Sequence, residues 1–206
     1  KLRLLSSLLS GVLFIILFNT LIIRTGLDFI DLILSYKLIA ILFTLICIIY
    51  LIQAFNIIDG LNGLSLITAI LCFSSIGIIA YEYNDFENYY FSIVMISILL
   101  GVLVFNFPFG KIFIGDSGAY IIGLYVSISG IMLIEKNIDL SPFVLVQILI
   151  YPSYELLRSF VRRLIIEKTG VFMPDSKHLH SKLYKINNLK YKLSSLKINV
   201  FTSLQI

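Results

Sequence analysis

The chain has 206 residues, of which 59% are hydrophobic and only 14% are charged, and its formal net charge is +4. A soluble domain carries about a quarter charged residues, so this composition excludes an ordinary water-soluble globular fold. Several stretches of about 20 residues contain almost no charge, and this is the length of helix that crosses a bilayer core.

The apolar stretches predict membrane-spanning helices along the whole chain. Backbone groups in lipid must pair within their own segment, so the spans are expected to be helices, and they are too continuously apolar for barrel strands. The sequence thus predicts one all-α domain, 1–206, built as a polytopic transmembrane bundle of six to seven spans. We place the spans at 4–24, 36–54, 63–81, 90–106, 118–134 and 142–160, with a weaker apolar segment at 193–206.

The basic residues are distributed unevenly between the two sides that alternating spans define. Thirteen of the sixteen Lys and Arg residues fall on one side, ten of them from position 158 onward. The other side receives only Arg24, Lys37 and Lys136. Because basic residues concentrate in cytoplasmic loops, we expect the first side to be cytoplasmic. That side holds three polar segments, at 54–63, at 106–118 and in a basic loop at 158–192.

The first polar segment is the run from Asn56 to Gly63, between two apolar spans. An ionisable residue at a membrane boundary, here Asp59, marks a functional site by default. Asn56, Asp59 and Asn62 are spaced by three, so one helical turn would place them on one face. The alternative interpretation is an ordinary interfacial turn, for which Asp-Gly is typical.

The second polar segment, 106–118, contains Lys111 and places Asp116 between glycines just before a span. Asp116 there can simply cap the following helix. Alternatively, a carboxylate beside unpaired backbone N–H groups and a nearby lysine can hold a Mg²⁺–diphosphate group. The residues alone leave both interpretations open.

The third polar segment is the basic tail, which contains Arg162, Arg163, His178 and His180. One interpretation is a loop that binds lipid headgroups, and another is a cationic clamp on substrate phosphates with imidazole donors. A zinc pair is a further alternative, but two histidines without a cytosolic cysteine do not complete a zinc site. Nucleic acid is not an expected partner, because these basic residues lie against a membrane. In the preceding span, Glu155 is expected to pair with Arg158 or Arg162.

Taken in this order, the three segments resemble the polyprenyl-phosphate N-acetylhexosamine-1-phosphate transferases, a family that includes the phospho-MurNAc-pentapeptide transferase. The resemblance extends from Asn56 to about Lys185. The Gly-Asp-Ser-Gly-Ala-Tyr run from Gly115 and the run Phe109-Gly110-Lys111 are more similar to the surface-polysaccharide branch, which initiates O-antigen and teichoic acid synthesis.

The resemblance implies a role for each segment. Asp116 is implied as the ligand of Mg²⁺, with Mn²⁺ as an alternative ion. Asn56, Asp59 and Asn62 are implied to line the sugar-nucleotide site, and the stretch Pro174-Asp175 to His178-Leu179-His180 is implied as the cytoplasmic histidine motif. Asp59 would orient or deprotonate the acceptor, while Lys111, Arg162 and Arg163 would screen phosphate charge.

The implied reaction moves N-acetylhexosamine-1-phosphate, or a related sugar-1-phosphate, from a UDP-sugar such as UDP-GlcNAc to undecaprenyl or another polyprenyl phosphate, releasing UMP. It would take place at the cytoplasmic face of a bacterial plasma membrane and begin a cell-envelope polysaccharide. The alternatives are a non-catalytic transporter or scaffold in polysaccharide export, and a CDP-alcohol phosphotransferase, whose Asp-Gly-x-x-Ala-Arg pattern is matched only at Asp59-Gly60.

One departure from the family pattern concerns an adjacent aspartate pair upstream of the first motif. No Asp-Asp occurs in this sequence. The segment that follows the pair in the family resembles Lys1 to Leu5, so we expect the pair and the preceding spans to lie before residue 1. If the natural protein begins at Lys1, the resemblance predicts an inactive remnant.

Overall fold

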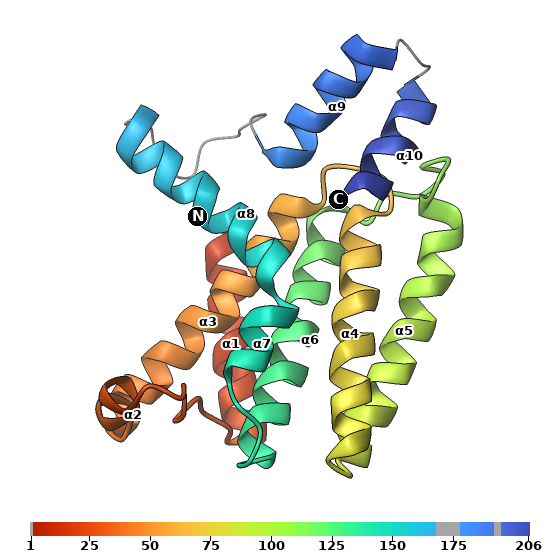
Figure 1. The fold of residues 1–206 in the computed structure, drawn as a ribbon. Helices are drawn as coiled ribbons and strands as arrows, with labels where there is room; N and C mark the ends of the chain where they lie inside the picture. The colour runs from red at the N-terminus through yellow and green to blue at the C-terminus, as the bar shows by residue number, and fades with distance from the viewer. Residues whose placement is uncertain (1, 168–177, 192–194) are drawn as a thin grey trace.

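The computed structural model describes residues 2–167, 178–191 and 195–206, and the regular structure in these ranges is helical. Five long helices and a broken sixth stand side by side as an upright bundle, and two further helices lie across one end of it (Figure 1). In chain order the helices are α1 (Leu2–Phe18), α2 (Asp28–Leu34), α3 (Lys37–Ile58), α4 (Leu64–Glu82), α5 (Phe86–Asn106), α6 (Gly115–Lys136), α7 (Phe143–Ile148), α8 (Ile150–Val161), the π-helix η1 (Arg162–Glu167), α9 (Leu179–Tyr191) and α10 (Ser195–Gln205). The predicted all-α membrane bundle is confirmed.

Among the described residues, four helices are long and apolar enough to cross a membrane: α3, α4, α5 and α6. They correspond to the second to fifth predicted spans. Their outer faces expose large apolar side chains such as Ile46, Leu71 and Ile98. A helix that is apolar on all sides is typical of a membrane span, because the face that does not pack on protein meets lipid.

Two predicted spans differ from the structure in ways that hydropathy does not detect. Helix α1 ends at Phe18 rather than continuing to 24, since Asn19 adopts a left-handed conformation with φ of 48°. The sixth span breaks at Leu149 into α7 and α8. Pro152 explains this break, because its nitrogen has no hydrogen to donate to the carbonyl of Ile148. That carbonyl instead accepts a hydrogen bond from the Cys72 thiol at 3.6 Å.

The core lies between α3, α4 and α6, where Phe55, Phe73 and Val126 are fully buried. Helix α6 approaches α3 so closely that a Cβ atom on Gly123 would lie 2.7 Å from the Cα atom of Ile52. The two helices are antiparallel, so the end of α3 and the start of α6 lie at the same end of the bundle (Figure 1). This backbone contact therefore fixes the first and second polar segments next to each other.

The predicted basic cytoplasmic loop at 158–192 is largely helical where the structure describes it. Helix α8 continues to Val161, η1 follows, and α9 occupies residues 179–191. The physical reason is a stripe at helical spacing that charge alone does not reveal: Leu179 and Leu183 are half-buried and Asn187 is buried. Asn187 donates a hydrogen bond from Nδ2 to Thr202 Oγ1 of α10 at 3.0 Å, so the lysines of α9 are carried on a helix that packs against α10.

Candidate functional site

The first two polar segments meet at the end of the bundle that α9 and α10 cover (Figure 1). Asn56 lies in the last turn of α3 and Asp116 in the first turn of α6. Asn56 donates a hydrogen bond from Nδ2 to Asp116 Oδ1 at 2.9 Å, across 60 positions of sequence. The structure thus brings together two of the residues that the sequence singled out.

Asp59 follows directly after α3 as its C-terminal cap. Burial raises the pKa of the Asp59 carboxyl from its usual 3.8 to about 6, and the negative charge of Asp116 adds to the increase. A carboxyl whose pKa is raised by burial and by a neighbouring carboxylate, at the membrane boundary, is typical of a functional site. Bringing the two groups together has an electrostatic cost that a bound cation would offset.

These residues supply some, but not all, of the ligands that a divalent metal ion requires. Within the described ranges, no group of three or more His, Cys, Asp and Glu side chains gathers as a metal cage. Mg²⁺ does not require such a cage, since it is usually bound by one or two carboxylates together with waters and substrate phosphates. Asp116, Asp59 and the amide oxygen of Asn56 supply the oxygen ligands that this ion prefers.

Asn62 does not share a helical face with Asn56 and Asp59, and that expectation is wrong because α3 ends at Ile58. The Asn62 side chain instead donates from Nδ2 to the carbonyl of Pro108 at 3.4 Å. Its backbone N–H donates to Asn199 Oδ1 at 3.2 Å, and its carbonyl accepts from Ser203 Oγ at 2.9 Å. Asn62 therefore connects the first segment with the second and with α10, and its role in substrate binding stays a prediction.

The buried Asn106 joins the same two segments, although its place in the second polar segment was the only feature that marked it in the sequence. Its Oδ1 accepts the N–H of Gly63 at 2.6 Å, and its Nδ2 donates to the carbonyl of Ile112 at 2.7 Å. Gly63 has a φ of 81°, and a Cβ atom there would lie 2.8 Å from the ring of Phe107. Only glycine fits this contact, which holds the loop before α4 against the loop after α5. The burial of Asn106 and its contact with Gly63 are visible only in the structure, so no sequence signal identifies this residue.

The predicted cations are placed differently from one another. Lys111 is exposed in the loop between α5 and α6, the loop that leads to Asp116. Arg162 and Arg163 lie on η1, which projects away from the end of the bundle where α3 and α6 meet (Figure 1). The substrate-binding role of all three stays a prediction.

His178 lies just before α9 and is buried against α8. Its Nδ1 is 3.7 Å from Glu155 Oε2, and Glu155 also pairs with Arg158 at 3.5 Å, one of the two partners expected for it. His180 belongs to α9, but its side chain lies outside the described residues, as do Pro174 and Asp175. The structure thus fixes one histidine of the predicted motif, and the binding roles of both stay predictions.

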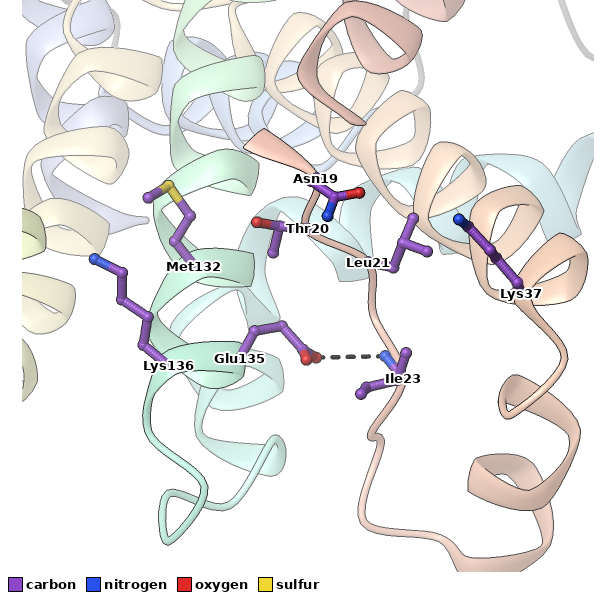
Figure 2. Close-up of a pocket in the computed structure, with 8 residues that line it drawn as sticks. All are labelled: Asn19, Thr20, Leu21, Ile23, Lys37, Met132, Glu135 and Lys136. Carbon is purple, nitrogen blue, oxygen red and sulfur yellow. Dashed lines mark hydrogen bonds between the residues drawn. The ribbon is translucent and has the colours of Figure 1, made fainter. Parts of the chain in front are cut away.

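A cavity of about 470 Å³ lies at the opposite end of the bundle (Figure 2). Its lining includes Lys37, Glu135 and Lys136, and Glu135 accepts the N–H of Ile23 at 3.4 Å. Lys136 ends the same helix on which Asp116 begins, and a helix of that length separates the two by about 30 Å. The cavity is therefore not part of the site around Asp116.

Comparison with known proteins gives a family match over the part of the chain that carries this geometry. The sequence model described as Glycosyl transferase family 4 matches residues 1–134. This range contains Asn56, Asp59 and Asp116, and it ends before the histidine segment.

Individual relatives agree with the family match. The chain is 35% identical over 138 residues to the undecaprenyl-phosphate alpha-N-acetylglucosaminyl 1-phosphate transferase of Thermotoga maritima, covering 67% of this chain and 41% of that protein. It is 31% identical over 156 residues to a probable undecaprenyl-phosphate N-acetylglucosaminyl 1-phosphate transferase of Bacillus subtilis, covering 75% of this chain and 43% of that protein.

A phospho-N-acetylmuramoyl-pentapeptide-transferase of Streptococcus agalactiae is similar over a shorter range, with 34% identity over 84 residues, covering 41% of this chain and 25% of that protein. The chain thus spans less than half the length of these relatives. The predicted resemblance to this family is confirmed, and the chain belongs to glycosyl transferase family 4.

Proposed function

We propose that this chain is the catalytic part of a membrane enzyme that transfers N-acetylhexosamine-1-phosphate from a UDP-sugar to a polyprenyl phosphate. The observation that carries the proposal is the meeting of Asn56, Asp59 and Asp116 at one end of the bundle. The proposal is also supported by the names of the relatives, two of which describe an N-acetylglucosaminyl 1-phosphate transferase acting on undecaprenyl phosphate. The active site would face the cytoplasm of a bacterium, in its plasma membrane, as the distribution of basic residues favours.

In the proposed reaction, a phosphate oxygen of the polyprenyl phosphate forms a bond to the phosphorus that carries the sugar. The bond from that phosphorus to the UMP oxygen breaks, and UMP leaves with the electron pair. A phosphate monoester titrates near neutral pH, so the acceptor does not require a strong base. Catalysis then depends on bringing two anions together in a fixed geometry.

The residues divide this work. Asp116, fixed by Asn56, and Asp59 would hold a Mg²⁺ ion, which when bound neutralises charge on the diphosphate. Asp59 in its ionised form would orient the acceptor phosphate or accept its proton, and a carboxyl with a pKa of about 6 suits that role near neutral pH. Lys111, exposed on the neighbouring loop, would screen phosphate charge.

An apolar groove on the bundle supports the choice of a lipid acceptor. Its volume is about 390 Å³, and its lining extends from Arg24 and Glu135, at the end away from Asp116, past Ile46 to Leu51 of α3 and Leu149. Leu51 lies eight residues before Asp59, which corresponds to about 12 Å along the axis of α3. A polyprenyl chain lying in this groove would carry its phosphate toward the carboxylates.

The test is an assay of product identity in membranes. The chain, with any sequence that flanks residues 1–206 in its gene, is supplied with Mg²⁺, UDP-GlcNAc and undecaprenyl phosphate. We expect UMP and a lipid-linked sugar diphosphate, and we expect Asp116→Asn to remove both. Release of CMP from a CDP-alcohol would instead favour a CDP-alcohol phosphotransferase. If no nucleotide is released by any donor, a transporter or scaffold is the better interpretation.

A further inference from the structure

Glu155 is a buried carboxylate of α8 to which the proposed reaction gives no role. Its side chain is only 1% exposed. A buried carboxylate is stable in its charged form only if nearby cations and hydrogen-bond donors compensate for the water that it has lost. The groups around Glu155 therefore indicate what it does.

The partners of Glu155 come from two segments that lie far apart in sequence. Arg158, one turn further along α8, is 3.5 Å from Oε1. The second oxygen, Oε2, accepts the N–H of Leu179 at 3.2 Å and lies 3.7 Å from His178 Nδ1. One oxygen is thus turned toward its own helix and the other toward the start of α9, more than 20 residues later.

The contact with Leu179 closes an otherwise unpaired position at the start of a helix. The first N–H groups of a helix have no partner within it, and an acidic side chain beside them is stabilising. Leu179 is the first residue of α9, so Glu155 supplies from another helix the acceptor that a local cap would normally supply.

We propose that Glu155 is the positioning residue of the histidine segment and that it holds His178 and the first turn of α9 against α8. Glu155 itself does not touch the substrate. The attachment of α9 to α8 stands on the contacts alone, whereas its consequence for turnover rests on the proposed function.

The experiment compares Glu155→Gln, which removes the charge at constant size, with Glu135→Gln as a matched control. Glu135 is half-buried and, like Glu155, accepts a backbone N–H from another segment, but at the opposite end of the bundle. Hydrogen exchange of residues 179–184 and the side-chain NMR signals of the only two histidines are measured on the full chain in nanodiscs.

In Glu155→Gln we expect the amides of the first turn of α9 to exchange about tenfold faster, since a hydrogen bond to a charged group contributes about that factor or more. One imidazole signal should move, and it should be the signal that His178→Ala removes. Glu135→Gln should change neither. If exchange in α9 and both imidazole signals are the same in Glu155→Gln as in the wild type, the proposal is wrong.

Turnover supplies a second readout that distinguishes positioning from general stability. We expect Glu155→Gln and His178→Ala each to lower the turnover number, and the double variant to be no slower than His178→Ala alone, because the two side chains act as one unit. Fully additive losses would overturn the proposal. If α9 loosens but none of the three variants is slower, Glu155 is confirmed as the positioning residue, and the substrate-binding role that the family resemblance implies for His178 is wrong.

Discussion

The charged side chains at the two ends of the bundle have different surroundings. At the end away from Asp116, Lys136 pairs with Asp85 at 3.5 Å and with Glu87. Arg24 donates to the carbonyls of Ile134, Asn137 and Ile138, where α6 terminates. At this end opposite charges and helix dipoles compensate one another, as in a part of the protein whose task is structural.

At the other end, the site brings together two side chains of like charge, Asp59 and Asp116. Asp116 accepts from Asn56, and the charge of Asp116 helps to raise the pKa of Asp59 to about 6. The unfavourable interaction between like charges therefore occurs at the end where a bound cation would offset it. The following predictions compare substitutions at the two ends.

The largest effect is expected from removing one carboxylate of the pair. Asp116→Asn should lower turnover by about 100-fold or more, because a charge that stabilises the transition state is lost. Asp59→Asn should have a comparable effect. Glu87→Gln, at the opposite end, also removes one negative charge and should leave turnover unchanged. Rates of UMP release in membranes check all three, and normal turnover in Asp116→Asn would break the comparison.

A pair of buried asparagines tests the two ends with the same chemical change. Asn106 joins the loops at the site, whereas Asn88 bridges α5 and α6 through Ser129, with bonds of 3.0 Å and 2.6 Å. Either substitution by alanine should lower stability by about 1–3 kcal/mol, because buried partners lose their hydrogen bonds. Only Asn106→Ala should also lower turnover, by about tenfold, since only it moves the loop before Asp116. Thermal unfolding and kinetics of the two variants measure this difference, and equal losses of turnover would contradict it.

The pH dependence of turnover should report Asp59. Its carboxyl prefers the protonated form in the folded state, with a pKa of about 6 against an ordinary 3.8. Its contribution to stability is therefore most favourable below pH 3.8 and is lost as the pH rises through 6. The ionised form needed for catalysis appears over the same window, so turnover should rise several-fold from pH 5 to pH 7. Excess Mg²⁺ should move the midpoint to lower pH, since a cation favours the carboxylate. If excess Mg²⁺ leaves the midpoint of the pH profile unchanged, Asp59 does not lie in the Mg²⁺ site.

The smallest effect is expected from Asp31 in α2, at the end away from the site. Hydrogen bonds from the side chain and backbone of Thr25 hold the pKa of Asp31 below its usual value. The stabilisation is present above the ordinary pKa and is lost as the pH falls through the lowered value. Because the carboxylate is only half-buried, Asp31→Asn should lower the unfolding temperature by no more than about 2 °C at pH 7 and leave turnover intact. A larger loss of turnover would show that the two ends are not independent.

Much of the fold could be predicted from the sequence because it follows from hydropathy. The positions of α3, α4, α5 and α6 follow from long uncharged runs, since lipid leaves no alternative to a helix. The early end of α1 and the break at Leu149 depend instead on single residues, Asn19 and Pro152, within stretches of high mean hydropathy. Helix α9 is not predicted, because the prediction for this segment uses its charge and not the helical spacing of its apolar residues.

The candidate site could be predicted only in part. Asp59 and Asp116 were identifiable as carboxylates at the membrane boundary, and their meeting is consistent with one site. The prediction that Asn56, Asp59 and Asn62 share one helical face is wrong, because their spacing of three does not reveal that α3 ends at Ile58. Asn106, Asn199 and Glu155 act through contacts that span between 24 and 137 positions, and no local pattern encodes such contacts.

The central claim is that Asp59 and Asp116 hold one divalent cation between them. The most direct measurement is Mn²⁺ binding by electron paramagnetic resonance in the presence of UDP, for the wild type, Asp59→Asn, Asp116→Asn and Glu87→Gln. We predict that each of the two asparagine substitutions weakens binding by about tenfold or more, whereas Glu87→Gln binds as the wild type does. Wild-type affinity in both Asp59→Asn and Asp116→Asn would contradict the account.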